Sequence, residues 1–335
     1  LVKYYRATGH TPALKLAIEL KNVALADYFT PDGGYDPTTW GGHTHSATCT
    51  MSSLAQLAEV LGDHDLLERV RTFYDRGLWQ MRDALGWVIE SAGNPKANPD
   101  MGEVNNTGDI VETALILGRA GHARYYADAE RIVRSHLLPS QLRDVSFITE
   151  PDNPEGIDAL RDIAARHIGA FGFPAPYGHH PIDLPQISFN LDIVGGAVGS
   201  LCEVVRATAR HDAAGHWVNL LFDHETQAIR VESPYTHDQL RVTVKQPGAL
   251  FVRVPPWADR AAMLASARDL GAIAHGDYLM IASPPVNRAI TFDLPLVEQS
   301  LTLHHRTRQI RVRLRGDEAV AMDNFGADMT FFQPY

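Results

Sequence analysis

The sequence contains very little cysteine and no long apolar run. Only Cys49 and Cys202 occur among its 335 residues, which excludes a disulfide framework and a C-x-x-C zinc spacing. No stretch approaches the roughly 18 apolar residues that a membrane span needs. The first ten residues, LVKYYRATGH, show neither a Met nor a signal-peptide pattern. We therefore expect no membrane partner, and the compartment, cytoplasmic or periplasmic, stays open.

The sequence also lacks an excess of positive charge. Its formal net charge is −10, which argues against nucleic acid or an anionic membrane as the main partner. An anionic substrate remains compatible with this charge, because local arginines could bind it. The P-loop, G-x-G-x-x-G, G-x-S-x-G and H-E-x-x-H motifs are all missing. The familiar nucleotide, serine-hydrolase and zinc-peptidase sites are thereby excluded.

A recurring helix–turn–helix pattern occupies the first two thirds of the chain. The turns contain Gly9, Gly62 and Gly121, which are 53 and 59 residues apart, and residues 201–218 form a fourth, weaker copy. Glycine at such points suits the left-handed conformation that ends helices. Apolar residues recur at helical spacing within the arms, as in Leu54 and Leu57. Stacked hairpins with long loops between them favour an α/α toroid over a generic helical bundle.

After about residue 216 the pattern changes to short β-type runs separated by turns. Their spacing predicts an antiparallel β-sandwich. We therefore predict two domains, an α/α toroid over residues 1–215 and a sandwich over residues 216–335. Because the chain opens as if within a helix, we also expect the toroid to be incomplete at its N-terminus.

Four loop segments gather polar and aromatic residues. They are WGGHTHS (40–46), GWVIES (86–91), GEVNNTGD (102–109) and FGFPAPYGHHPIDLPQISFNLDIVGG (171–196). In a toroid of antiparallel hairpins such loops converge on one rim. The side chains that we expect to contact substrate there are Trp40, His43, His45, Asn105, Asn106, Tyr177, His179 and His180.

Several of these residues have a simpler interpretation. His43 and His45 could bind a metal, but such a pair is more typical of a polar loop. Asn106 or Asp109 could cap a helix that begins near Ile110, which leaves Glu103 unexplained. Glu90 follows an apolar run, so partial burial would raise its pKa and suit it to act as an acid. A solvated glutamate at a loop edge is the alternative.

The order of these motifs resembles glycoside hydrolase family 127, typified by β-L-arabinofuranosidases. The matching stretches are HTHSATCTMSSLAQLAEVLGDHDLL (43–67), GWVIES (86–91), GEVNNTGDIVETALILGRAGHARYYADAERIVRSHLL (102–138), HWVNLLF (216–222) and ALFVRVPPWA (249–258). The resemblance covers most of the chain from about residue 40 onward. It implies an (α/α)6 barrel followed by β-sandwich domains, with the first hairpins preceding Leu1.

The resemblance also assigns individual residues. Glu90 falls at the general acid/base, and Glu103 falls at a zinc-binding glutamate. The family's cysteine two residues later is Asn105 here, and its adjacent cysteine pair, which holds the nucleophile, aligns with Asp192 and Ile193. Since the soft ligands are replaced, we expect no zinc and no other cofactor.

The prediction is therefore a metal-independent glycoside hydrolase acting on a plant or microbial polysaccharide or oligosaccharide. Glu90 would be the acid, and Glu103 or Asp192 the base or nucleophile. Two alternatives stay open. One is a polysaccharide lyase that uses Tyr177 with His179 or His180 on a uronate-containing glycan. The other is a non-catalytic sugar-binding protein. The sequence does not indicate an oligomeric state.

Overall fold

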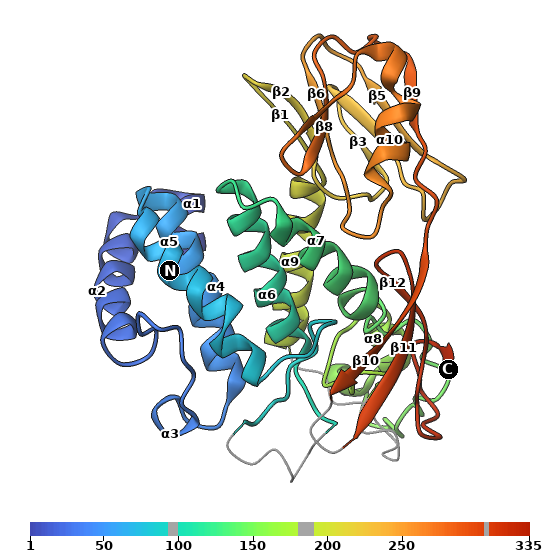
Figure 1. Ribbon diagram of the computed structural model, residues 1–335. Helices are drawn as coiled ribbons and strands as arrows, with labels where there is room; N and C mark the ends of the chain where they lie inside the picture. Colours follow the sequence, from blue (N-terminus) through green and yellow to red (C-terminus); the bar gives the residue numbers. More distant parts are fainter. Residues whose placement is uncertain (93–99, 180–190, 305–307) are drawn as a thin grey trace.

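The computed structural model describes residues 1–92, 100–179, 191–304 and 308–335, and it describes the backbone alone for Leu191 and Asp192. Helices come first and sheets follow (Figure 1). The helices are α1 (Val2–Thr8), α2 (Thr11–Asp27), α3 (Pro37–Trp40), α4 (Thr44–Leu61), α5 (His64–Asp75), α6 (Val104–Arg119), α7 (Arg124–Ile132), which continues into the π-helical turn η2 (Val133–Leu137), α8 (Ile163–His167), α9 (Leu191–Thr208) and α10 (Arg260–Ser266).

The strands occupy the C-terminal part of the chain, with α10 inserted among them. They are β1 (Ala209–Asp212), β2 (Gly215–Val218), β3 (His224–Glu225), β4 (Ile229–Glu232), β5 (Leu240–Val244), β6 (Leu250–Arg253), β7 (Ile273–His275), β8 (Tyr278–Ile281), β9 (Ala289–Phe292), β10 (Glu298–His304), β11 (Gln309–Arg315), β12 (Glu318–Met322) and β13 (Gln333–Pro334). The short β-type runs predicted after about residue 216 contain strands.

The predicted hairpin turns are present at three glycines. Gly9, Gly62 and Gly121 have φ angles of 70°, 64° and 104°, and each follows the end of a helix. A Cβ atom at any of the three would meet no atom within 4 Å. The left-handed backbone, and not crowding, therefore accounts for glycine at these turns.

The prediction of a fourth helical hairpin at residues 201–218 was wrong. Helix α9 ends at Thr208, and the chain continues directly as β1 and β2 instead of a second helix. The side chain of Asp212 accepts a hydrogen bond from the backbone N–H of Ala214 and closes a tight turn. Gly215 then takes a φ of 136°, which a helix does not accept. The predicted domain boundary at 215/216 lies after this turn and stays a prediction.

Helix α6 lies at the centre of the helical part, between α4 and α9. Its side chains are buried almost throughout, from Val104 to Gly118. Glycines allow close approach to α9, since a Cβ atom at Gly196 would lie 2.9 Å from the Cβ of Asn105, and one at Gly108 would lie 2.5 Å from Ser200 Oγ. The two helices therefore run in the same direction, with their first turns at the same end.

Two sheets share one hydrophobic core. One sheet has the strand order β1-β2-β6-β8-β7 and the other β3-β4-β5-β9, and both contribute to a cluster that includes Val218, Val242, Val252 and Phe292. Most strand pairs are antiparallel, but β2 and β6 pair in parallel. The reason is topological, since the chain crosses to the other sheet through β3–β5 before β6 returns.

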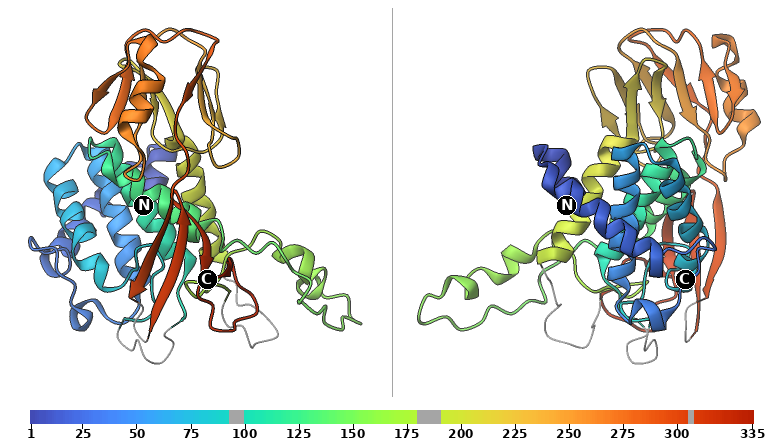
Figure 2. Two further views of the ribbon diagram at one scale, coloured as in Figure 1. Left: turned by 45° about the vertical axis from the view of Figure 1, so that its right-hand side comes forward. Right: turned by 90° about the vertical axis from the view of Figure 1, so that its left-hand side faces the viewer.

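A third sheet, β10-β11-β12-β13, belongs to a separate hydrophobic cluster. It lies beside the helical part and below the other two sheets (Figure 1). Its buried residues Ile310, Val312 and Leu314 contact Leu85 and Tyr177 of the preceding loops. In both views of Figure 2 the segment that carries α8 extends away from the body of the molecule.

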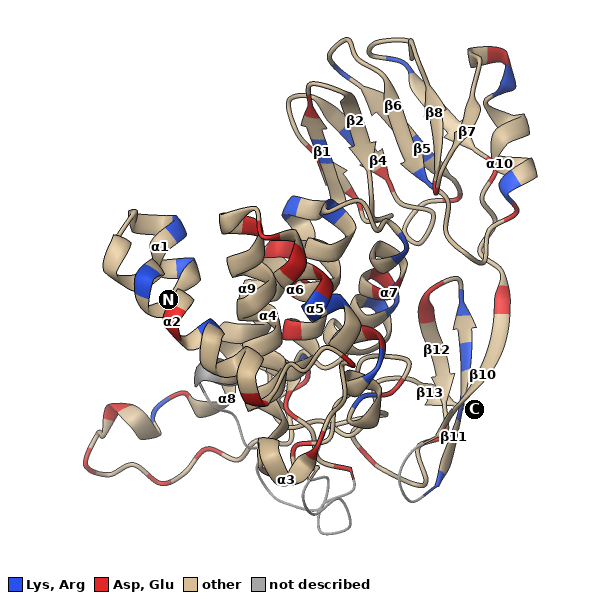
Figure 3. Ribbon diagram, turned by 60° about the vertical axis from the view of Figure 1, so that its left-hand side comes forward, with Lys and Arg blue, Asp and Glu red and all other residues tan. Residues whose placement is uncertain are grey.

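Charges of both signs are interleaved on the helical part (Figure 3). Arg119 pairs with Glu59 at 2.8 Å and Arg124 with Asp75 at 2.9 Å. Positive and negative side chains thus lie close together on this part of the surface. Among the residues that the structure describes, no helix is long and apolar enough to span a membrane.

Candidate active site

All four predicted loop segments meet at the N-terminal ends of α4 and α6, since the carbonyls of Gly172 and Pro174 in the fourth accept backbone hydrogen bonds there. The backbone N–H of Thr44 donates to the carbonyl of Glu90 at 3.0 Å, and the N–H of Glu90 donates to the carbonyl of Met101 at 2.9 Å. Isolated β-bridges join His43 to Ser91 and Ile89 to Gly102. Glu90 is therefore fixed between the start of α4 and the loop that leads into α6.

Glu103 is the N-cap residue of α6, but its side chain does not cap the helix. Instead its Oε1 atom lies 3.1 Å from His43 Nε2, and its side chain is only 9% exposed, against 53% for His43. The side chain also lies at the N-terminal end of α6, which is the positive end of the helix dipole. Glu103 is thus a nearly buried carboxylate with an accessible histidine on one side.

The Glu90 side chain is half-buried on the same side of the helices. Burial raises its pKa, the charge of Glu103 raises it further, and His43 acts in the opposite direction. The two carboxyls therefore interact electrostatically although they belong to different loops. A carboxyl with a raised pKa beside a second carboxyl is the usual arrangement of an acid and its partner.

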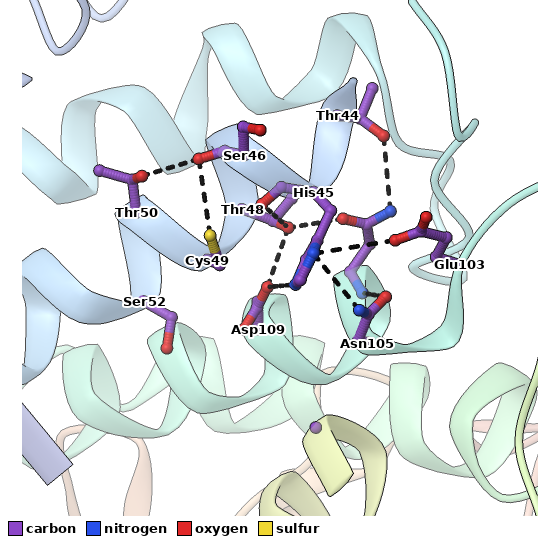
Figure 4. A network of polar contacts seen from close by, with 12 residues as sticks. Thr44, His45, Ser46, Thr48, Cys49, Thr50, Ser52, Glu103, Asn105 and Asp109 are labelled. Atoms are coloured by element: carbon purple, nitrogen blue, oxygen red, sulfur yellow. Dashed lines mark hydrogen bonds and ion pairs between the residues drawn. The ribbon is translucent and has the colours of Figure 1, made fainter. Parts of the chain in front are cut away.

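A second network lies behind Glu103 (Figure 4). His45 Nε2 lies 3.5 Å from Asp109 Oδ2, and the Nδ1 atom of His45 faces Asn105 Nδ2 at 3.4 Å. Thr48 Oγ1 is 2.7 Å from Asn106 Oδ1 and 2.9 Å from Asp109 Oδ2. Burial raises the pKa of Asp109 well above its usual range. The Thr48 hydroxyl thus lies within donor distance of two side-chain oxygens of α6, those of Asn106 and Asp109.

The capping role considered for Asn106 and Asp109 was wrong. Helix α6 begins at Val104, and not near Ile110, so both residues lie inside it. Asn105 and Asn106 are 2% and 0% exposed and face neighbouring helices, which argues against the predicted contact with sugar hydroxyls. The sequence also gave no role to Thr48, although a hydroxyl on α4 one turn after Thr44 could have indicated a contact with α6.

The zinc ion implied by the family resemblance does not fit these residues. Asn105 offers a neutral amide where a thiolate would be required, and Ile193 is a buried apolar side chain, 1% exposed. Zinc sites of this kind depend on soft, negatively charged ligands. In the described ranges, no three His, Cys, Asp or Glu side chains are grouped so that they could hold a metal ion.

Asp192 lies in the first turn of α9. Because Gly196 packs against Asn105, the backbone places position 192 one turn further toward Glu103. Its place in the fold is therefore compatible with the role predicted for it, which stays a prediction.

Trp40 belongs to an aromatic cluster and not to the Glu90–Glu103 cluster. Its ring stacks on Phe73 with centroids 5.2 Å apart and meets Phe29 edge-on at 4.8 Å. The aromatic neighbours already occupy its faces, so a sugar-stacking role has little support. Trp87 is similarly buried, and its Nε1 donates to the carbonyl of Pro174.

Tyr177 and His179 have other partners than Glu90 and Glu103. The Tyr177 hydroxyl donates to Asp100 at 3.1 Å and accepts from Arg308 at 2.7 Å, and burial raises its pKa to about 12. Such a phenol is a poor base at neutral pH, and Arg308 already pairs with Asp100 at 2.6 Å. The lyase alternative therefore loses support. His179 packs against Phe331, and His180 lies outside the described residues.

The structure thus consists of a helical part followed by sheets rich in antiparallel pairs. Glu90 and Glu103 lie at the end of the helical part where the loops meet. Solved structures that share this fold include a glycoside hydrolase, at 13% sequence identity and a TM-score of 0.62, with 95% of this chain and 59% of that chain covered. The chain thus has a fold like that of the family-127 glycoside hydrolases, as the next two structures show.

One is a family-127 β-L-arabinofuranosidase from Geobacillus stearothermophilus T6, at 15% identity and a TM-score of 0.58, with 94% of this chain and 56% of that chain covered. The other is a family-127 β-arabinofuranosidase at 15% identity and a TM-score of 0.59, with 95% and 54% covered. The chain thus spans little more than half the length of these proteins. No family model matches the sequence, and no curated protein matches it either.

Proposed function

We propose that the protein is a glycoside hydrolase in which Glu90 is the general acid and Glu103 the base or nucleophile. The observation that carries the proposal is that Glu90 and Glu103, from separate loops joined by backbone hydrogen bonds, lie at the same end of the helices in different environments. Glu90 has a raised pKa from burial and from the charge of Glu103. Glu103 lies 3.1 Å from His43 and at a helix N-terminus. The fold likeness to glycoside hydrolases supports the same assignment.

In the proposed reaction a protonated Glu90 donates its proton to the oxygen of the leaving group. The carboxylate of Glu103 either attacks the anomeric carbon or deprotonates the attacking water, as one of the paired carboxyls does in most glycosidases. Asp192 is the alternative for that second role. His43 is more than half exposed and is placed to hydrogen-bond a sugar hydroxyl next to Glu103.

The proposed architecture is an arc of an α/α toroid followed by a β-sandwich and a further sheet. The helices α4, α6 and α9 would form the inner wall, with the candidate site at the end where their first turns lie. The substrate class that we propose is a plant or microbial saccharide. Arabinofuranosides are the first substrates to test, because two proteins of this fold are arabinofuranosidases.

The experiment is a hydrolysis screen with product detection by chromatography. Nitrophenyl glycosides and neutral oligosaccharides, arabinofuranosides first, are incubated with the wild-type protein and with Glu90→Gln and Glu103→Gln. We expect release of a sugar by the wild type and loss of release in Glu103→Gln. A uronate-containing glycan is included with detection of the unsaturated product in the ultraviolet. Formation of that unsaturated product would contradict the hydrolase proposal and support the polysaccharide lyase. The absence of turnover on every substrate would support the non-catalytic sugar-binding protein.

A further inference from the structure

A cavity of about 580 Å³ lies between the segment that follows η2 and the third sheet. One wall comes from residues between 138 and 147, and the other from Glu318, Ala319 and residues 328–332. No residue of the Glu90–Glu103 cluster lines it. Its volume falls within the range of cavities that bind small ligands, roughly 300–1,000 Å³. The cavity is therefore a separate place where a ligand of one or two sugar units could fit.

Aromatic rings form much of the cavity wall. Phe147, Phe331 and Phe332 line it, and all three are only half-buried. The ring of Phe331 meets His179 edge-on at 4.9 Å and Phe332 at 6.0 Å, which holds it in place. Half-buried rings at a cavity wall offer an apolar surface for the C–H face of a sugar.

The charges around the cavity favour a neutral ligand over an anion. Three carboxyls line it, those of Asp144, Glu318 and Asp328. Of the two lining arginines, Arg134 is already used, since its Nη2 donates to the carbonyl of Leu221 at 2.7 Å and pairs with Glu130 at 3.0 Å. The remaining polar groups suit hydroxyls, which both donate and accept hydrogen bonds.

Two buried histidines lie on either side of Phe331. His179 lines the cavity, and His136 lies behind the ring at a centroid distance of 6.3 Å. His136 is 1% exposed, and within the described residues neither of its ring nitrogens has a hydrogen-bond partner. Burial lowers the pKa of His136 to about 3 and that of His179 to about 4. Of the two, only His179 lines the cavity, and its neutral imidazole near pH 7 matches a hydroxyl as donor and acceptor.

We propose that this cavity is a second carbohydrate site that binds a neutral sugar unit through Phe331 and Phe147. It would hold part of a longer glycan, or a free oligosaccharide, away from the Glu90–Glu103 cluster. The proposal concerns binding and does not depend on the proposed activity, so either can fail without the other.

The test measures binding by isothermal titration calorimetry and saturation-transfer NMR. The probes are arabinotetraose, xylotetraose and cellotetraose, with tetragalacturonate as the anionic counterpart. Phe331→Ala removes a ring from the wall. Ser146→Trp fills the cavity from an exposed rim position without removing a packed side chain. The matched control is Phe325→Ala, an exposed phenylalanine of the same segment outside the cavity, and Glu103→Ala marks the candidate active site.

We expect at least one neutral probe to bind and tetragalacturonate not to bind. Phe331→Ala and Ser146→Trp should each weaken binding about tenfold or more, whereas Phe325→Ala and Glu103→Ala should leave it within about twofold. The proposal is overturned if no neutral probe binds or if tetragalacturonate binds as well. It is also overturned if both cavity variants bind like the wild type, or if Glu103→Ala abolishes binding, because the ligand then lies at the other site.

Discussion

His43 Nε2 lies 3.1 Å from Glu103 Oε1, although the two residues are 60 positions apart in the sequence. One precedes α4 and the other precedes α6, so the contact exists because these helices pack side by side with their N-terminal ends together. The backbone of Glu90 is bonded to both neighbouring segments. The packing of two helices therefore determines which acidic groups meet.

The ionisation of Glu90 should respond to both of its neighbours. Glu103→Gln removes a negative charge, so we expect the pKa of Glu90 to fall. His43→Gln removes a group that lowers this pKa, so we expect it to rise. Carbon-13 NMR of the labelled Glu90 carboxyl across a pH titration measures both. Shifts in the same direction in the two variants would contradict the geometry.

Asp109 should make the stability of the fold depend on pH. Burial raises its pKa in the folded protein, so its contribution is fully present below the unfolded pKa, about 3.9, and is lost as the pH rises through the folded pKa. Asp109→Asn keeps a neutral side chain. We therefore expect urea unfolding to show the variant gaining on the wild type as the pH rises from about 4 to 8.

The control for this experiment is Asp36→Asn. Asp36 is an exposed N-cap whose pKa is lowered, chiefly by hydrogen bonds from Thr38. Its contribution is present above the unfolded pKa and is lost as the pH falls, so this variant should lose stability relative to the wild type at higher pH. Parallel pH profiles for the two variants would show that burial does not control Asp109.

Glu130 should be among the charged residues that matter most for stability. It is 0% exposed, forms an ion pair with Arg253, and accepts the backbone N–H of Leu221 at 3.0 Å. Removing one partner of a buried pair leaves an unpaired charge, so Glu130→Ala should cost about 3–5 kcal/mol. Glu59→Ala, which breaks partly exposed pairs with Arg119 and Arg6, should cost about 0–1 kcal/mol. Chemical denaturation measures the loss of unfolding free energy in each variant. Equal losses in the two variants would contradict this prediction.

Protein purified without added zinc should not contain a stoichiometric metal ion. The reason is the chemistry of Asn105 and Ile193 at the positions where the family resemblance requires thiolates. Inductively coupled plasma mass spectrometry measures the number of metal ions bound per chain. One zinc per chain that disappears in Glu103→Ala would overturn this expectation.

The sequence predicted the helices, strands and turns better than it predicted which of them pack against one another. Local patterns found the strands and the turns at Gly9, Gly62 and Gly121, because backbone preference and apolar periodicity are local properties. They placed the start of α6 several residues too late, since Asn105 and Asn106 resemble caps in isolation. Their burial depends on α4 and α9, which no local pattern reports. The packing of β10–β12 on the helical part is a long-range property of the same kind.

The same difference between local patterns and tertiary contacts applies to the candidate site. Glu90 and Glu103 were selected from loop position and family resemblance, His43 was selected from loop position, and the structure brings these three together. Trp40, Tyr177 and His179 were selected from loop position and residue type, and their partners are Phe73, Arg308 and Phe331. A polar or aromatic side chain in a loop is equally suited to a core, an ion pair or a ligand, and only its tertiary neighbours separate these uses.

The most direct test of the central claim is the activity of Glu90→Gln on two substrates that share one sugar, a natural glycoside and its nitrophenyl analogue. General acid catalysis contributes about 10²–10⁴-fold in rate, so kcat/KM on the natural glycoside should fall by at least about 10²-fold. The loss should be much smaller on the nitrophenyl substrate, whose leaving group needs little protonation, while Glu103→Gln should impair both. Near-wild-type hydrolysis of the natural glycoside by Glu90→Gln would contradict the assignment.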